Sequence, residues 1–390
     1  MKAALALGAG VFATVVTFGV VGFQLAKKLT APLSERVYDV AIRHIDDSAN
    51  RRVVILDRTQ RTDALGDYSL LMRAGGVVRL SNTVEDRGRG LVGREVLSNS
   101  GYELEAGMHG SWTGINYLSP ADAGLESLDV DVMTAVGPAP AWLVSSRTGL
   151  SNNEWAIHVH GLGSPRAGTL RGVQVAADVG YTSLVVSYRN DGEGPTIGAG
   201  RSELGSVEVD DVRAAVQFAF DRGAVRVVLF GWSMGGAIAL QIAADPEVRG
   251  AIAGLVLESP VLDWVSTIKA NCVRAGLPSW AGQLAIPWLS VRLLSRLTGL
   301  RSSVDLPSFD WIARAEELTL PTLVLHGRND TSAPHEASSR LRALRPDRVE
   351  LELFDADHTM SWNSDPERWR STVSDWLASL SAAGQFTAKQ

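Results

Sequence analysis

The stretch Val227–Leu240, VVLFGWSMGGAIAL, indicates the fold of this chain. It joins an apolar strand-like run to an apolar helix-like run through a corner rich in glycine. Gly231, Ser233 and Gly235 form the pattern G-x-S-x-G at that corner, between a predicted strand and a predicted helix. Glycine at both flanks lets the backbone turn sharply without a Cβ clash. The pattern therefore predicts that Ser233 projects above the carboxyl ends of the strands, where open α/β sheets bind ligands.

Apolar strands alternate with helices from Glu154 to the C-terminal region. The predicted strands are EWAIHVHG, TSLVVSY, VRVVLFGW, IAGLVLESP, LPTLVLHGRND and VELELFDADH. This alternation predicts a mostly parallel sheet flanked by helices on both faces. Residues of about 262–318 interrupt it, and their length and helical periodicity favour a cap over a simple connector. Four tryptophans of this insertion either line an apolar pocket or pack the cap onto the sheet: Trp264, Trp280, Trp288 and Trp311.

A serine hydroxyl needs a base to become nucleophilic, and the base needs an orienting carboxylate. Asp330 ends the strand-like run LVLHGRND, and His358 lies in FDADHTMSW after the last predicted strand. We expect His358 to take the proton of Ser233 and Asp330 to hold the imidazole. Glu258, directly after the run AGLVL, is the rival acid.

An oxyanion hole requires two backbone amides near the nucleophile. The amide of Met234 begins the helix after Ser233, and the amide of Leu162 lies in the loop HVHGLGSPR after the first strand of the alternating region. His158 and His160 stand two residues apart in the same strand. No carboxylate accompanies them in the sequence, so we expect a structural role for both, with no metal and no cofactor.

The motifs HGLG, GWSMGG, GRND and DADH occur in this order within residues 130–385. In this order they resemble the α/β-hydrolase superfamily, and within it the Hydrolase-4 or serine-aminopeptidase-like branch. The resemblance implies a triad of Ser233, Asp330 and His358. It also implies an oxyanion hole formed by Leu162 and Met234, and no cofactor.

Residues 3–26 contain no charged side chain and are numerous enough to cross a bilayer as a helix. A cleaved signal peptide and a buried core helix are the alternatives. Against the signal peptide, a cut after Ala26 places Gln24 where a small residue is required. We therefore predict a transmembrane anchor and a single-pass membrane protein in contact with the lipid bilayer. Basic residues follow the span more densely than they precede it, which favours a cytoplasmic catalytic domain.

Residues 32–130 are predicted to form a β-rich N-terminal segment, followed by a hydrolase domain over residues 131–385. Gly88, Gly90 and Gly93 match G-x-G-x-x-G, but no strand precedes them and no helix follows, so we interpret them as a loop. Cys272 is the only cysteine, which excludes an intramolecular disulfide. The net charge of −6 gives no indication of a nucleic-acid partner.

The sequence thus predicts an α/β protein with the α/β-hydrolase fold, a mostly parallel central sheet flanked by helices, a helical cap, an N-terminal transmembrane helix and a β-rich N-terminal segment. The predicted function is a membrane-anchored serine hydrolase that cleaves carboxylic ester or lipid-like acyl substrates through an acyl-Ser233 intermediate. A serine peptidase or aminopeptidase of the same fold is the alternative within enzymes. A catalytically silent, membrane-tethered binding module is the alternative from another class.

Overall fold

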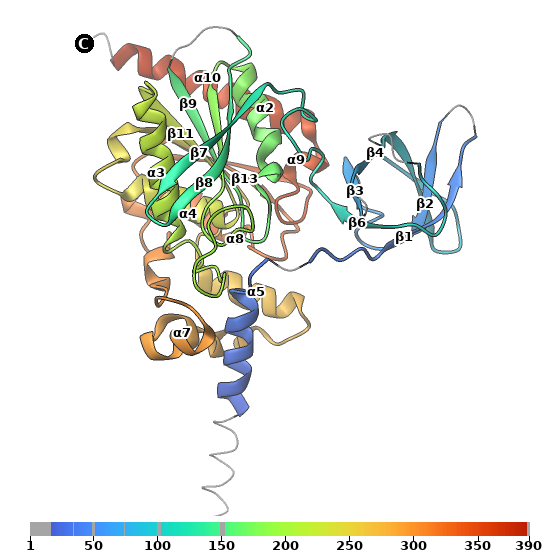
Figure 1. Cartoon of the computed structure of the whole chain (residues 1–390), viewed down its shortest axis with the longest axis horizontal. Coiled ribbons are helices and arrows are strands. Elements are labelled where there is room, and N and C mark those ends of the chain that lie inside the picture. The colour runs from blue at the N-terminus through green and yellow to red at the C-terminus, as the bar shows by residue number, and fades with distance from the viewer. Residues whose placement is uncertain are drawn as a thin grey trace, which may run out of the picture.

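The computed structural model describes residues 17–33, 35–48, 51–73, 75–99, 103–148 and 153–387. Its largest feature is an eight-stranded sheet with the order β14-β13-β12-β11-β9-β10-β8-β7 (Figure 1). Six strands run parallel to their neighbours, and β8 and β7 add an antiparallel edge. The strands are β7 (Ser127–Thr134), β8 (Gly137–Val144), β9 (Glu154–Val159), β10 (Thr182–Val186), β11 (Arg226–Trp232), β12 (Ile252–Glu258), β13 (Thr322–Gly327) and β14 (Val349–Phe354).

Helices cover both faces of this sheet, which is why its central strands β9, β11, β12 and β13 are buried along almost their whole length and consist mainly of apolar residues. In β11, Leu229 packs into one core and Phe230 into the core on the opposite face. The first core contains apolar residues of α3 (Glu208–Asp221), α4 (Met234–Ala244) and α8 (Glu336–Leu344). The second contains those of α2 (Leu170–Asp178) and α10 (Pro366–Thr387). A short helix, α9 (Ser361–Ser364), precedes α10.

The predicted cap lies between β12 and β13 and consists of short helices. Asp263 caps the start of the first cap helix, because its carboxylate accepts hydrogen bonds from the backbone N–H groups of Val265 and Ser266 at 2.8 and 3.0 Å. Trp264 and Trp311 are buried in the cap and its contact with the sheet. The helices are α5 (Trp264–Arg274), η3 (Ser279–Leu284), α6 (Ile286–Ser290), α7 (Arg292–Thr298), η4 (Leu306–Phe309) and η5 (Ala315–Glu317).

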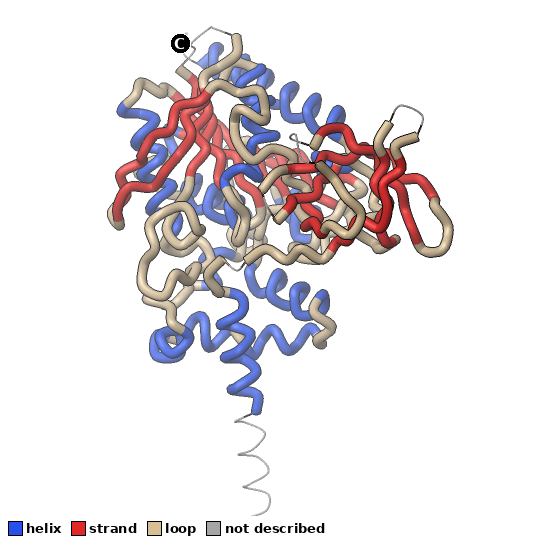
Figure 2. The backbone as a smooth tube through the Cα atoms, turned by 45° about the vertical axis from the view of Figure 1, so that its right-hand side comes forward, coloured by secondary structure: helices blue, strands red, loops and turns tan. Residues whose placement is uncertain are grey.

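Residues 17–29 form a helix that lies against the cap (Figures 1 and 2). Phe18 meets the Trp280 ring at 5.9 Å, and Phe23 meets the Trp288 ring at 5.2 Å, both edge to face. The contact at Gly22 is so close that an added Cβ atom would lie 2.1 Å from the Leu284 carbonyl oxygen. The described part of the apolar run thus packs against protein.

This arrangement corrects the prediction for the N-terminus. Residues 3–16 of the predicted anchor lie outside the described residues, and in the part of the chain that the structure describes no helix has the length and apolar character to cross a membrane. This finding contradicts the predicted transmembrane helix and the single-pass membrane localisation, and it gives no support to the bilayer contact that followed from them.

The segment predicted only as β-rich contains a closed six-stranded barrel with the order β1-β2-β5-β4-β3-β6. All of its strand pairs are antiparallel, and apolar side chains such as Ile42, Leu56 and Leu70 fill its interior. Gly88 and Gly90 lie in the turn between β4 and β5, both with positive φ. The strands are β1 (Val40–Asp46), β2 (Val53–Asp57), β3 (Tyr68–Met72), β4 (Val77–Asp86), β5 (Leu91–Ser98) and β6 (His109–Thr113).

The barrel is a second correction to the predicted fold class. An alternation of apolar and polar residues with period 2 predicts strands. Whether these strands close into a barrel depends on which of them pair, and the pairing is set by residues far apart in the chain. Strand β7 of the central sheet begins at Ser127, and the predicted domain boundary between residues 130 and 131 stays a prediction.

Candidate active site

Ser233 stands alone between the last residue of β11 and the first residue of α4. Its backbone has φ 53° and ψ −115°, a conformation that costs free energy for a residue with a side chain. The turn has no room for side chains at its flanks: a Cβ atom on Gly231 would lie 2.6 Å from the Gly235 oxygen, and one on Gly235 would lie 2.1 Å from the Val159 oxygen. The glycines therefore allow the strained turn that holds Ser233 at the end of the strand.

The structure brings Ser233, His358 and Asp330 together. The Ser233 Oγ lies 2.8 Å from His358 Nε2, and His358 Nδ1 lies 2.8 Å from Asp330 Oδ2. Because an ionised carboxylate only accepts hydrogen bonds, Nδ1 carries the proton and Nε2 is left to accept the hydroxyl of Ser233. Asp330 follows β13 and His358 follows β14. The three residues therefore occur in the predicted chain order, and they also lie together in the structure.

A second imidazole, that of His326, faces the same carboxylate. His326 Nε2 lies 3.1 Å from Asp330 Oδ2, and His326 Nδ1 lies 2.8 Å from the hydroxyl of Ser338. The backbone N–H groups of Ser332 and Ala333 donate to Asp330 Oδ1 at 2.9 and 2.7 Å. Burial alone would raise the pKa of Asp330, but hydrogen bonds from His326 and His358 hold that pKa well below its usual range. Asp330 is therefore a fixed anion at neutral pH.

The rival acid, Glu258, is the last residue of β12 and is buried. Its carboxylate accepts the backbone N–H of Ser361 at 3.1 Å and the indole N–H of Trp369 at 3.0 Å. These contacts tie β12 to α9 and α10. The structure thus gives Asp330, and not Glu258, the hydrogen bond to His358.

The two residues expected to form an oxyanion hole flank Ser233. Met234 is the first residue of α4. Leu162 follows Gly161, whose position is so close to the serine that an added Cβ atom would lie 3.0 Å from the Ser233 Cβ. Leu162 and Met234 also line one common cavity. Their assignment as oxyanion donors stays a prediction.

His160 shapes the loop that carries Leu162. His160 Nε2 lies 3.0 Å from Asp191 Oδ2, and its ring stacks on Tyr188 with centroids 4.3 Å apart. Asp191 is the carboxylate companion that the sequence did not reveal. Its own oxygens accept backbone N–H groups, including that of Tyr188 at 2.8 Å. Among the residues that the structure describes, no group of three or more His, Cys, Asp and Glu side chains could hold a metal ion.

His158 points into the core of the sheet. Its ring lies 4.6 Å from the Phe230 ring, and its Nε2 lies 3.1 Å from the hydroxyl of Ser183. Complete burial lowers the pKa of His158 to about 3. Below pH 6.5 the unfolded chain therefore binds a proton that the folded chain excludes.

This difference predicts a pH dependence of stability. As the pH falls from 6.5 towards 3, His158 lowers the free energy of unfolding by up to about 1.4 kcal/mol per pH unit. The His158→Gln variant lacks this imidazole. Between pH 4.5 and 6.5 the slope of its unfolding free energy against pH should therefore be smaller, by the amount that corresponds to about one bound proton. Urea unfolding at several pH values measures both slopes, and equal slopes for the two proteins would contradict the buried neutral imidazole.

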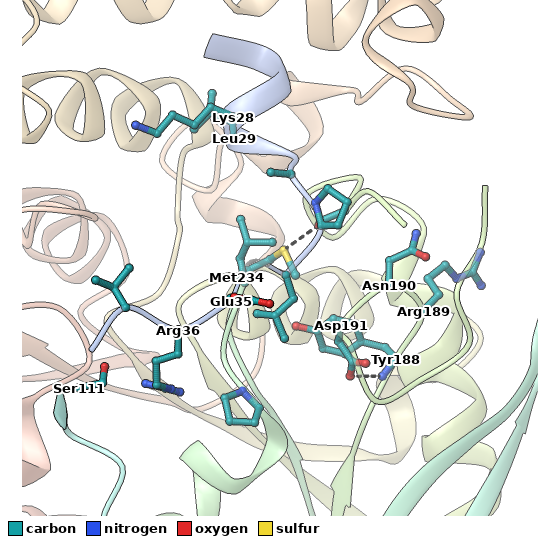
Figure 3. A pocket seen from close by; sticks show the side chains of 18 of the residues that line it. Lys28, Leu29, Glu35, Arg36, Ser111, Tyr188, Arg189, Asn190, Asp191 and Met234 are labelled. Atoms are coloured by element: carbon teal, nitrogen blue, oxygen red, sulfur yellow. Dashed lines mark hydrogen bonds between the residues drawn. The ribbon is translucent and has the colours of Figure 1, made fainter. Parts of the chain in front are cut away.

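Two cavities lie beside Ser233. A barrel-side cavity of about 220 Å³ is lined by Ser233, His358 and Thr359, and by residues of the segment that leaves β6. A linker-side cavity of about 680 Å³ lies next to Met234 and Leu162. Figure 3 shows Lys28 and Leu29 from the end of the N-terminal helix around this second cavity, together with Tyr188, Asp191 and Met234. Glu35 and Arg36 also surround it; they belong to the linker between that helix and β1, which gives the cavity its name.

None of the cap tryptophans is among the described residues that line these two cavities. Trp264 donates its indole N–H to the Leu204 carbonyl at 3.0 Å, and Trp311 is fully buried. Trp280 and Trp288 contact the N-terminal helix. Of the two alternatives for this group, packing of the cap is the one that the structure supports.

Sequence reasoning missed three residues around the site. His326 stands four residues before Asp330 in HGRND, and Asp191 stands three residues after the predicted strand TSLVVSY, so both had a local signal. Asn363 had none: it is buried, and it bridges α9 to the barrel with a hydrogen bond to Asp67 across 296 residues.

Residues 156–372, more than half of the chain, match the Alpha/beta hydrolase family. The chain therefore belongs to that family, which confirms the predicted superfamily and the prediction of a hydrolase. Residues 41–113, which include most of the barrel, match a Domain of unknown function (DUF8805). No curated protein matches the chain in sequence.

Solved structures with the same fold include esterases. The esterase Pf2001 of Pyrococcus furiosus is 22% identical with a TM-score of 0.52, over 68% of this chain and 96% of that one. Est1E of Butyrivibrio proteoclasticus, solved with ferulic acid, is 17% identical with a TM-score of 0.51, over 65% of this chain and 99% of that one. At these identities the likeness establishes the fold.

Proposed function

We propose that the chain hydrolyses carboxylic esters through an acyl intermediate on Ser233. The observation that carries this proposal is the chain of two 2.8 Å hydrogen bonds from Ser233 Oγ through His358 to Asp330. The family match and the esterases among the structures with the same fold support the same reaction class.

The first half of the reaction forms the acyl intermediate. Ser233 Oγ attacks the ester carbonyl carbon while its proton passes to His358 Nε2. The backbone N–H groups of Leu162 and Met234 stabilise the negative charge that develops on the carbonyl oxygen, and the N-terminal end of α4 adds its dipole. His358 then gives the proton to the alcohol oxygen, and the bond between that oxygen and the acyl carbon breaks.

The second half repeats these steps with water. His358 Nε2 takes one proton of the water as its oxygen attacks the acyl carbon, and the proton returns to Ser233 Oγ when the carboxylic acid leaves. Asp330 stays ionised throughout and stabilises the imidazolium. Its depressed pKa and two backbone donors suit that role.

A fluorophosphonate probe tests the nucleophile directly. We expect one covalent adduct per chain, located on Ser233 by peptide mass spectrometry, and hydrolysis of short methyl esters measured by proton release. Ser233→Ala should take up no probe. Labelling at another residue, or no labelling of the folded chain, would overturn the proposal in favour of a silent binding module. Faster cleavage of aminoacyl amides than of matched esters would replace it with a peptidase.

A further inference from the structure

The two cavities beside Ser233 differ in which reacting groups they touch. The barrel-side cavity is lined by both Ser233 and His358. The linker-side cavity is lined by Met234, and neither Ser233 nor His358 is among its described lining residues; Leu162 lines both cavities. Because His358 must deliver a proton to the departing alcohol oxygen, the alcohol has to lie in the cavity that His358 lines. The acyl group is then left with the larger, linker-side cavity.

The barrel builds one wall of the smaller cavity. Thr113 ends β6, and Gly114 and Ile115 follow it into the cavity lining. The Ile115 side chain packs on Gly168, another lining residue, because a Cβ atom added to Gly168 would lie 3.8 Å from both Cγ1 and Cδ1 of Ile115. The two residues meet and close the cavity at this point. The result is a cavity of about 220 Å³, small compared with the pockets of typical ligand sites.

This wall is held rigidly at Gly114. A Cβ atom there would lie 2.4 Å from the Met360 sulfur, so the backbone packs directly on the loop that follows His358. The buried side chain of Asn363 donates to the carbonyl oxygens of Gly114 and Asp67 at 3.0 and 2.6 Å. In return, the Asp67 N–H donates to the Asn363 carbonyl at 2.8 Å.

The same asparagine is linked to the histidine loop through Arg171. Arg171 donates to Asn363 Oδ1 and to the carbonyl oxygen of Thr359, both at 2.7 Å. Thr359 directly follows His358. Hydrogen bonds through Asn363 and Arg171 thus join the barrel wall to the backbone of the loop that carries His358.

We propose that the segment 113–115 is the wall of an alcohol-binding subsite, and that Ile115 restricts the substrate to esters of compact alcohols. The inference rests on the proposed esterase function and assigns to the N-terminal barrel a role in substrate selection. The variable acyl group extends along the linker-side cavity.

Two ester series test this assignment. The first keeps a butyryl group and varies the alcohol from methyl to benzyl, and the second keeps methanol and lengthens the acyl chain. We use kcat/KM because it reports acylation, the step in which the alcohol is still bound. Ile115→Ala should raise the ratio of kcat/KM for benzyl butyrate to kcat/KM for methyl butyrate by about 10- to 100-fold. It should leave the kcat/KM values of the acyl series unchanged. Ile115→Trp should lower that ratio.

Leu33→Ala is the matched control. Leu33 lines the linker-side cavity, against Gly192, and is half exposed. Its truncation should alter the acyl series and spare the alcohol series. Thermal unfolding and fluorophosphonate labelling verify that each variant folds with a competent serine.

The outcomes separate the two proposals. If Ile115→Ala changes the acyl series, or changes neither series, the alcohol subsite is overturned while the esterase function stands. If the wild-type chain is folded but hydrolyses no ester and takes up no probe, the proposed function itself fails and the subsite fails with it.

Discussion

Ser233→Ala should lower kcat for a short methyl ester on the order of 10⁵- to 10⁶-fold, and His358→Ala should lower it by about as much. The reason is that the nucleophile and its base act as a unit. The alanine at position 233 leaves His358 with no oxygen to activate. The alanine at position 358 leaves the Ser233 hydroxyl protonated and therefore a poor nucleophile.

The double variant gives the sharper result. Because either change removes the same attack, Ser233→Ala combined with His358→Ala should be no slower than either single variant within about tenfold. If the kcat losses of the two single variants instead multiplied in the double variant, the two side chains would not act as one hydrogen-bonded unit. Ser233→Ala keeps its Cβ atom and hence the φ of 53°, so its melting temperature should stay close to that of the wild type.

Asp330→Asn should lower kcat about 10⁴-fold at pH 7. The backbone N–H groups of Ser332 and Ala333 hold the amide oxygen in the place of Oδ1. The amide nitrogen then faces His358 Nδ1 and His326 Nε2, where it can only donate. His358 Nδ1 becomes an acceptor, its proton moves to Nε2, and the imidazole no longer accepts the proton of Ser233.

Glu258→Gln is the control for this second prediction, because it makes the same chemical change in the rival acid. Glu258 contacts the backbone of Ser361 and the indole of Trp369, so its amide variant should lose stability and keep kcat within about tenfold. Steady-state kinetics and thermal unfolding measure both variants. A larger kinetic loss for Glu258→Gln than for Asp330→Asn would reverse the assignment of the acid.

The N-terminus shows why a local apolar pattern did not determine the structure. Residues 3–26 met the length and charge criteria for a membrane span, but those criteria describe the segment alone. In the described part, Phe18 and Phe23 pack on tryptophans of the cap, and Gly22 lies directly against Leu284. An apolar helix is stabilised equally by any apolar surface, so its hydropathy did not identify which surface covers it.

Local sequence patterns were sufficient to predict the strands and helices of the hydrolase domain and the chain order of the candidate site residues. Glycine spacing at Gly231 and Gly235, apolar runs and strand-to-helix alternation are properties of neighbouring residues, and they placed Ser233, Asp330 and His358 at the ends of β11, β13 and β14. The closure of β1–β6 into a barrel and the position of Ile115 beside the cavity at Ser233 became visible only in the three-dimensional arrangement. The same holds for Asn363, which joins that wall to the histidine loop. These features depend on contacts between residues up to 296 positions apart, and no local periodicity encodes such pairings.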